Sequence, residues 1–204
     1  MCKSEYKEKF LEAIKLGNQL LSGWSVDADE LGDFIDRIEK SGSQNRNRSF
    51  NKELVELLKE QLINKGFVKP ANKCLEYSTY AVQLIEDLQD RGRLPELPFF
   101  LTVGNVYYKG EPEPSLASKE SIEALIKKGK GVSDVNIHVW ITSFDLSVID
   151  LTLQFSLAAK GKLAGQPVAM VTDPLNKDYV YEPILVNNLF DRAICHGDLT
   201  SSWV

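Results

Sequence analysis

Residues 136–151, NIHVWITSFDLSVIDL, predict the centre of the fold because their apolar and polar side chains alternate. Alternation with a period of two is typical of β-strands, and a short turn at 143–145 would join two antiparallel strands. One face of this hairpin then carries the side chains that we expect in the core, namely Ile137, Val139, Ile141, Ile149 and Leu151. The other face carries His138 and Asp150, which this turn would set opposite each other.

The residues around the hairpin predict a mixed α+β domain. Apolar side chains at helical spacing predict a helix over 73–91 and a shorter one over 118–128. β-Branched and aromatic residues predict strands over 98–103 and 106–108, with a kink at Gly104, and over 135–142, 148–153 and 179–186. The stretch 111–114, EPEP, predicts an acidic loop at the surface.

The N-terminal part predicts helices alone. Three amphipathic helices are expected, starting near Ser4, Asp27 and Asn51, and the last ends at Gly66. The stretch 43–49, which contains two arginines, predicts a solvated loop between the second and third helices. We therefore divide the chain into a helical segment, 1–66, and an α+β core, 67–204, which together form one compact unit.

Composition narrows the class of protein. The chain has 204 residues, with 24 basic and 29 acidic side chains and a net charge of −5, so it lacks the basic surplus that is usual in nucleic-acid-binding proteins. No apolar run approaches the roughly 20 residues of a membrane helix, and residues 1–5 start no secretory signal. We expect a soluble, cytoplasmic protein with no membrane partner, and export as an effector without such a signal stays open.

Cysteine and histidine are scarce, which limits the possible chemistry. Three widely spaced cysteines suggest neither a disulfide framework nor a zinc site, and we expect no metal and no cofactor. The chain has two histidines, His138 and His196. The neighbours Cys195 and His196 form one conceivable catalytic pair, but on an extended strand their side chains point to opposite faces, which favours a structural role.

Cys74 is the candidate nucleophile. If Asn72 is the N-cap of the helix over 73–91, Cys74 lies at the second helical position. There the unpaired backbone N–H groups and the positive end of the helix dipole favour a thiolate. The alternative is that Cys74 is a small apolar residue of the core.

His138 and Asp150 supply the other groups that a thiol enzyme needs. A carboxylate that pairs with an imidazole fixes its tautomer, so the second ring nitrogen can take a proton from the thiol. The alternatives are a hydrogen-bonded structural histidine and a cross-strand ion pair. The tryptophan between them, Trp140, either lines the site or fills space.

These residues resemble the transglutaminase-like branch of the papain-like cysteine enzymes. The similarity covers about residues 70–155 and consists of Cys74 at a helix start, His-x-Trp at 138–140 on a strand, and Asp150 on the next strand. Related bacterial cell-wall peptidases favour Asp-Cys-Ser-Gly at the nucleophile, and the sequence NKCL at 72–75 departs from this pattern. The departure argues against a wall-peptide substrate.

The resemblance implies a papain-like core and acyl transfer through a Cys74–His138–Asp150 triad. The enzyme would be a thiol hydrolase, such as a cysteine protease or deamidase, or an acyltransferase, and its substrate a protein, a peptide or a small amide. The backbone N–H of Cys74 and the side chain of Asn72 are the nearest candidate donors to the oxyanion, although Asn72 could be the N-cap alone. The alternative function is a non-catalytic protein-binding module that retains this fold.

Overall fold

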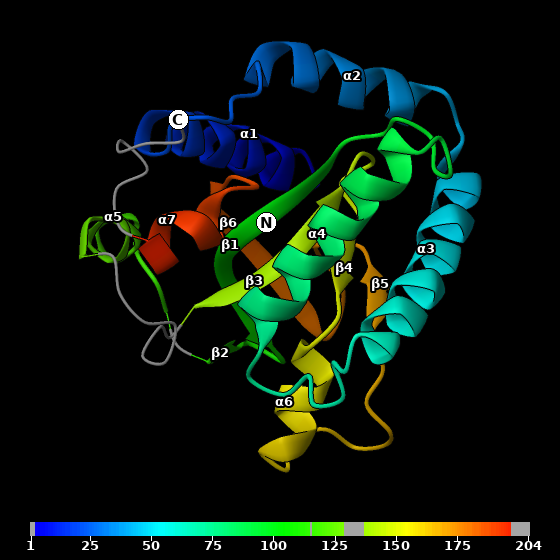
Figure 1. The fold of residues 1–204 in the computed structure, drawn as a ribbon, viewed down its shortest axis with the longest axis vertical. Helices are drawn as coiled ribbons and strands as arrows, with labels where there is room; N and C mark the ends of the chain where they lie inside the picture. The colour runs from blue at the N-terminus through cyan, green and yellow to red at the C-terminus, as the bar shows by residue number, and fades with distance from the viewer. Residues whose placement is uncertain (1–2, 115, 129–136, 197–204) are drawn as a thin grey trace. The chain divides into compact units, whose positions relative to one another are not determined.

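The computed structural model describes residues 3–114, 116–128 and 137–196 and confirms the α+β class (Figure 1). Helices and antiparallel strands follow one another along the chain in a mixed order. The helices are α1 (Lys3–Leu20), α2 (Ala28–Lys40), α3 (Gln44–Asn64), α4 (Cys74–Asp90), α5 (Lys119–Lys128), α6 (Leu153–Ala159) and α7 (Phe190–His196). The strands are β1 (Phe99–Tyr108), β2 (Glu111–Glu113), β3 (His138–Ser143), β4 (Val148–Asp150), β5 (Met170–Thr172) and β6 (Tyr179–Val186).

The chain divides into two compact units. Residues 1–34, 101–138 and 174–204 form the first unit, and residues 35–100 and 139–173 form the second. Both units therefore contain residues from each side of position 66, where the sequence suggested a boundary.

In the first unit, β1 pairs antiparallel with β2 and with β6. The register between β1 and β6 shifts at Val103 and Gly104, which confirms the kink predicted at this glycine. Helix α1 packs on β6. It buries Tyr6, Phe10 and Ile14, which recur every four residues and so lie on one helix face.

In the second unit, β3, β4 and β5 pair antiparallel in that order, and α3 packs against α4 and β5 (Figure 1). A buried amide joins α3 to the turn after β3. Asn51 accepts a hydrogen bond from the Ser143 hydroxyl at 3.0 Å and donates one to the Asp145 carboxylate at 3.2 Å. These bonds satisfy both polar ends of a side chain that burial would otherwise destabilise.

Three predictions about local structure are wrong. Residues 44–49, expected in a loop, form the first turns of α3, although both of their arginines are exposed as expected. The expected loop at 111–114 contains β2, and Glu113 is buried. Cys195 and His196 lie at the end of α7 rather than on a strand. Strand β2 exists because it pairs with the end of β1 across a turn of two residues, 109 and 110.

The strand expected over 148–153 is shorter than predicted. Strand β4 ends at Asp150, and α6 begins at Leu153. Positions 135 and 136 of the strand expected over 135–142 lie outside the described residues.

Candidate active site

Cys74 is the first residue of α4 and is partly exposed. The N-cap is Lys73, and no side chain caps the helix, so the prediction of Asn72 as N-cap is wrong. Asn72 instead has a left-handed backbone, with φ of 60°, a conformation that asparagine tolerates better than most residues. It lies in a turn closed by the Lys73 N–H and the Pro70 carbonyl, and its own N–H donates to the Ser156 hydroxyl at 2.9 Å.

The side of α4 that carries Cys74 faces β3. Ser78 lies one turn after Cys74, and residues four apart share a helix face. The buried Ser78 hydroxyl donates to the carbonyl of Val139 at 3.2 Å. Val139 directly follows His138 along β3. Ser78, one turn after Cys74, is therefore joined to the second residue of this strand.

Asp150 is the last residue of β4, and its side chain is 1% exposed. Its Oδ1 accepts hydrogen bonds from the backbone N–H groups of Thr152, at 3.0 Å, and Leu153, at 2.9 Å. These donors lie where α6 begins and have no acceptor within the helix. Asp150 thus ends the strand and starts the helix, a structural role that the sequence did not suggest.

The register between β3 and β4 differs from the predicted one. Ile141 pairs with Ile149 and Thr142 with Val148, so Asp150 is level with Trp140 and not with His138. The Ser143 N–H donates to the Ser147 carbonyl, so the three-residue loop is 144–146 and lies one position later than expected. The shift is by two positions, so Asp150 keeps the strand face that was predicted for it.

Strand β3 is buried on both faces. The set expected in the core, from Ile137 to Leu151, is buried as predicted, but the face with His138 and Trp140 is buried as well. Trp140 is fully buried. His138, the one residue of β3 that belongs to the first unit, is 4% exposed, and its ring centre lies 6.5 Å from that of Tyr181 in the same unit.

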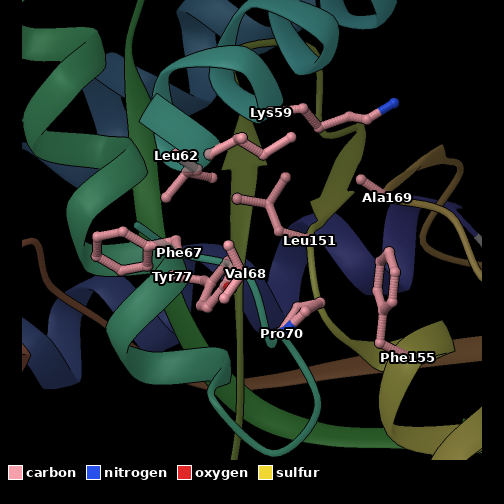
Figure 2. Close-up of a pocket in the computed structure, with 10 residues that line it drawn as sticks. Lys59, Leu62, Phe67, Val68, Pro70, Tyr77, Leu151, Phe155 and Ala169 are labelled. Carbon is pink, nitrogen blue, oxygen red and sulfur yellow. The ribbon is translucent and has the colours of Figure 1, made fainter. Parts of the chain in front are cut away.

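An apolar pocket of about 340 Å³ lies in the second unit, among α3, α4, α6 and the loop after α3 (Figure 2). Nine of its ten lining residues are apolar or aromatic, and the tenth is Lys59. The pocket was not predicted from the sequence. The signal was present in Phe67, Val68 and Pro70, three apolar residues in the connection between two helices.

Within the described part of the chain, histidine, cysteine, aspartate and glutamate side chains do not gather in groups of three or more that could hold a metal ion. No helix in the same residues has both the length and the apolar character needed to cross a membrane. No family model, curated protein or solved structure matches the chain.

Proposed function

We propose that the protein is a cysteine-dependent acyl-transfer enzyme in which Cys74, His138 and Asp150 act together. The observation that carries the proposal is the place of Cys74. Its side chain is partly exposed in the first turn of α4, and the start of a helix is a position typical of reactive cysteines. The same helix side is hydrogen-bonded to the residue next to His138.

The proposed reaction begins with transfer of the Cys74 proton to His138. The thiolate attacks the carbonyl carbon of an amide, and the backbone N–H of Cys74 stabilises the oxyanion that forms, with the exposed Asn72 side chain as a second candidate donor. His138 then returns the proton to the leaving amine as the C–N bond breaks. Attack of water on the resulting thioester gives hydrolysis, and attack of an amine gives transamidation.

The proposed role of Asp150 is to orient His138. The backbone of α6 holds Oδ1 of the carboxylate, and in the proposal Oδ2 accepts a hydrogen bond from the imidazole. An imidazole fixed in this way presents its other nitrogen to the thiol. A carboxylate held by two backbone bonds is already ordered, so no further ordering would be needed during the reaction.

The alternative is a non-catalytic binding module. One observation favours it, because Ile63 and Val68 expose 60% and 69% of their side chains and such apolar residues are typical of interfaces. This alternative predicts a buried, unreactive cysteine at position 74. The partial exposure of Cys74 supports the enzyme instead.

The rate at which iodoacetamide alkylates Cys74 at pH 6 tests the proposal. A cysteine with the ordinary pKa of about 8.5 is less than about 1% thiolate at this pH. We expect Cys74 in the folded protein to react at least about tenfold faster than in the urea-unfolded chain, with the modified cysteine identified by peptide mass mapping. His138→Ala should remove this difference. Equal rates in the parent protein and in His138→Ala would refute the triad.

A further inference from the structure

The apolar pocket of the second unit is open to solvent and has an apolar rim. Ile63 and Val68 line it and are among the most exposed large apolar side chains in the described residues. Apolar side chains at the rim of a concave apolar surface are characteristic of ligand sites. The volume of about 340 Å³ falls in the lower part of the range of such sites, roughly 300–1,000 Å³, which suits a small ligand group.

Short connections link the pocket wall to the residues of the proposed triad. Pro70 is joined to Lys73, the neighbour of Cys74, by the hydrogen bond that closes their turn, at 3.1 Å. Tyr77 lies three residues after Cys74, within one turn of α4, and neighbours at this spacing have Cβ atoms about 5–6 Å apart. Leu151 directly follows Asp150. Two of these wall residues thus lie within one turn of the nucleophile, whereas the third adjoins the carboxylate only along the backbone, since neighbouring side chains on a strand point to opposite faces.

The wall favours an uncharged, apolar group. Its single cationic side chain, Lys59, is neutralised by an ion pair with Glu56 at 2.8 Å. The Tyr77 hydroxyl is buried and makes no well-formed hydrogen bond, so this residue contributes its ring, which packs edge to face against Phe67. Burial is the main cause of the raised pKa of Tyr77, and it outweighs the opposing effects of the Lys69 backbone and the Lys73 charge.

We propose that this pocket binds an apolar side chain or acyl group of the substrate, next to the carbonyl that Cys74 attacks. The inference rests on the proposed function and adds a substrate class to it. A substrate with a linear or aromatic hydrocarbon group beside its reactive carbonyl is preferred, and one with a charged group there is rejected.

Two alkylating reagents with the same reactive group test this inference. Iodoacetamide lacks an apolar group, whereas N-hexyl-iodoacetamide carries one that can enter the pocket. Each rate at Cys74 is divided by the rate of the same reagent with N-acetylcysteine. We expect the normalised rate to be at least about tenfold higher for the hexyl reagent, because binding beside the nucleophile raises the local concentration of the reactive group.

Two variants test whether the preference for the hexyl reagent depends on the pocket. Val68→Glu places a charge at the rim at a site exposed enough to tolerate it, and Ala169→Phe fills part of the pocket without a charge. Both should lower the preference to less than about twofold. The matched control is Leu116→Glu, which changes an equally exposed apolar residue that does not line the pocket and should keep the preference.

The outcomes separate this inference from the proposed function. The pocket assignment is overturned if the parent protein prefers the hexyl reagent by less than about tenfold, or if the preference persists in both Val68→Glu and Ala169→Phe. This holds even if His138→Ala slows alkylation by iodoacetamide. In another outcome, both variants remove the preference for the hexyl reagent, while the rate of alkylation by iodoacetamide is the same with and without His138. This outcome retains the pocket as a ligand site and refutes the triad.

Discussion

The carboxylate of Asp150 has a structural role that is independent of catalysis. Both hydrogen bonds from the backbone of 152–153 go to Oδ1, and the side chain is buried. A catalytic role must therefore be tested with a substitution that keeps these bonds. Asparagine retains one carbonyl oxygen in place of Oδ1 but has no charge and no second acceptor.

We predict that Asp150→Asn and Asp150→Ala separate the two roles. Asp150→Ala removes the acceptor of two buried N–H groups and should lower the free energy of unfolding by about 1–3 kcal/mol. Asp150→Asn should lose less than half as much stability, yet should reduce the alkylation rate of Cys74 at pH 6 as far as His138→Ala does. Urea denaturation and the alkylation assay measure the two effects. An Asp150→Asn protein with the parent alkylation rate would leave Asp150 with its structural role alone.

Glu182 links α1 to the strands of the first unit. It accepts a hydrogen bond from Lys9 at 2.7 Å and one from the Tyr107 hydroxyl at 3.1 Å. The hydrogen bond with Glu182 raises the pKa of Lys9. The pKa of Tyr107 is raised mainly by burial and also by its bond to Glu182. Both groups bind their protons more tightly in the folded protein, so their contribution to stability is complete below pH 10 and is lost as the pH rises above their ordinary values of about 10–10.4.

Glu182→Gln should accordingly destabilise the protein at pH 8.5 but not at pH 11.5. Because the Lys9 side chain is 37% exposed, we expect a loss of no more than about 1 kcal/mol at the lower pH. Urea denaturation of both proteins at the two pH values gives this difference. Lys15→Gln is the control, because Lys15 lies on the same helix as Lys9 and forms an exposed ion pair with Asp29 of α2. If the difference in free energy of unfolding between the parent protein and Glu182→Gln instead grows with pH, the raised pKa values assigned to Lys9 and Tyr107 are contradicted.

The position of Cys74 could be predicted from the sequence, whereas the local structural roles of Asn72 and Asp150 could not. Cys74 is at a helix start as predicted, because apolar spacing sets the position of α4 to within a residue or two. Asn72 was misassigned because asparagine suits both an N-cap and a left-handed turn, and the turn with Pro70 decided between them. The bonds of Asp150 to the next helix were not predicted, although Asp150 and Thr152 are both residue types that favour a helix start.

Helix α1 lies so close to β6 that only a glycine fits at position 17, where the two backbones meet. A Cβ atom at Gly17 would overlap the carbonyl oxygen of Val186, which belongs to the backbone and cannot rotate away. The Asn187 side chain also donates to the Gly17 carbonyl, at 3.3 Å. The helix and the strand are therefore in contact through their backbones at this point.

We predict that Gly17→Ala destabilises the protein by at least about 2 kcal/mol, although alanine favours helices, because α1 must move away from β6. Gly32→Ala in α2 is the matched control. Its Cβ would meet Leu11 Cδ1 at 3.2 Å, the end of a flexible side chain, so the gain of up to about 1 kcal/mol in helix propensity should offset the crowding. Thermal and urea unfolding of both variants measure the effect. A Gly17→Ala protein as stable as Gly32→Ala would show that α1 does not lie against β6 as described.

The missed elements are short and depend on distant partners. Strand β5 has three residues and exists because it pairs with β4. The turn between β3 and β4 lacks a glycine, and Leu146 has a φ of 66° and is almost fully buried. A left-handed leucine is rare, so sequence rules could not predict that the loop lies one position later, at 144–146, which shifts the register. Burial of its side chain offsets the strain of this conformation.

For the molecule as a whole, composition and periodicity predicted the α+β class of the fold. The long helices and strand β6 follow from apolar spacing, which is a local property. The two compact units each combine segments from distant parts of the chain, and β1 and β3 each cross from one unit to the other. Such groupings result from packing between distant segments, which no local pattern encodes.

The distance between the sulfur of Cys74 and the imidazole of His138 in a crystal structure decides whether the two groups form a catalytic pair. Residues in such a pair are within hydrogen-bond reach, with looser geometry when no substrate is bound. We predict a distance of no more than about 4.5 Å from the Cys74 Sγ to the nearer ring nitrogen of His138. A distance beyond about 8 Å would contradict the account.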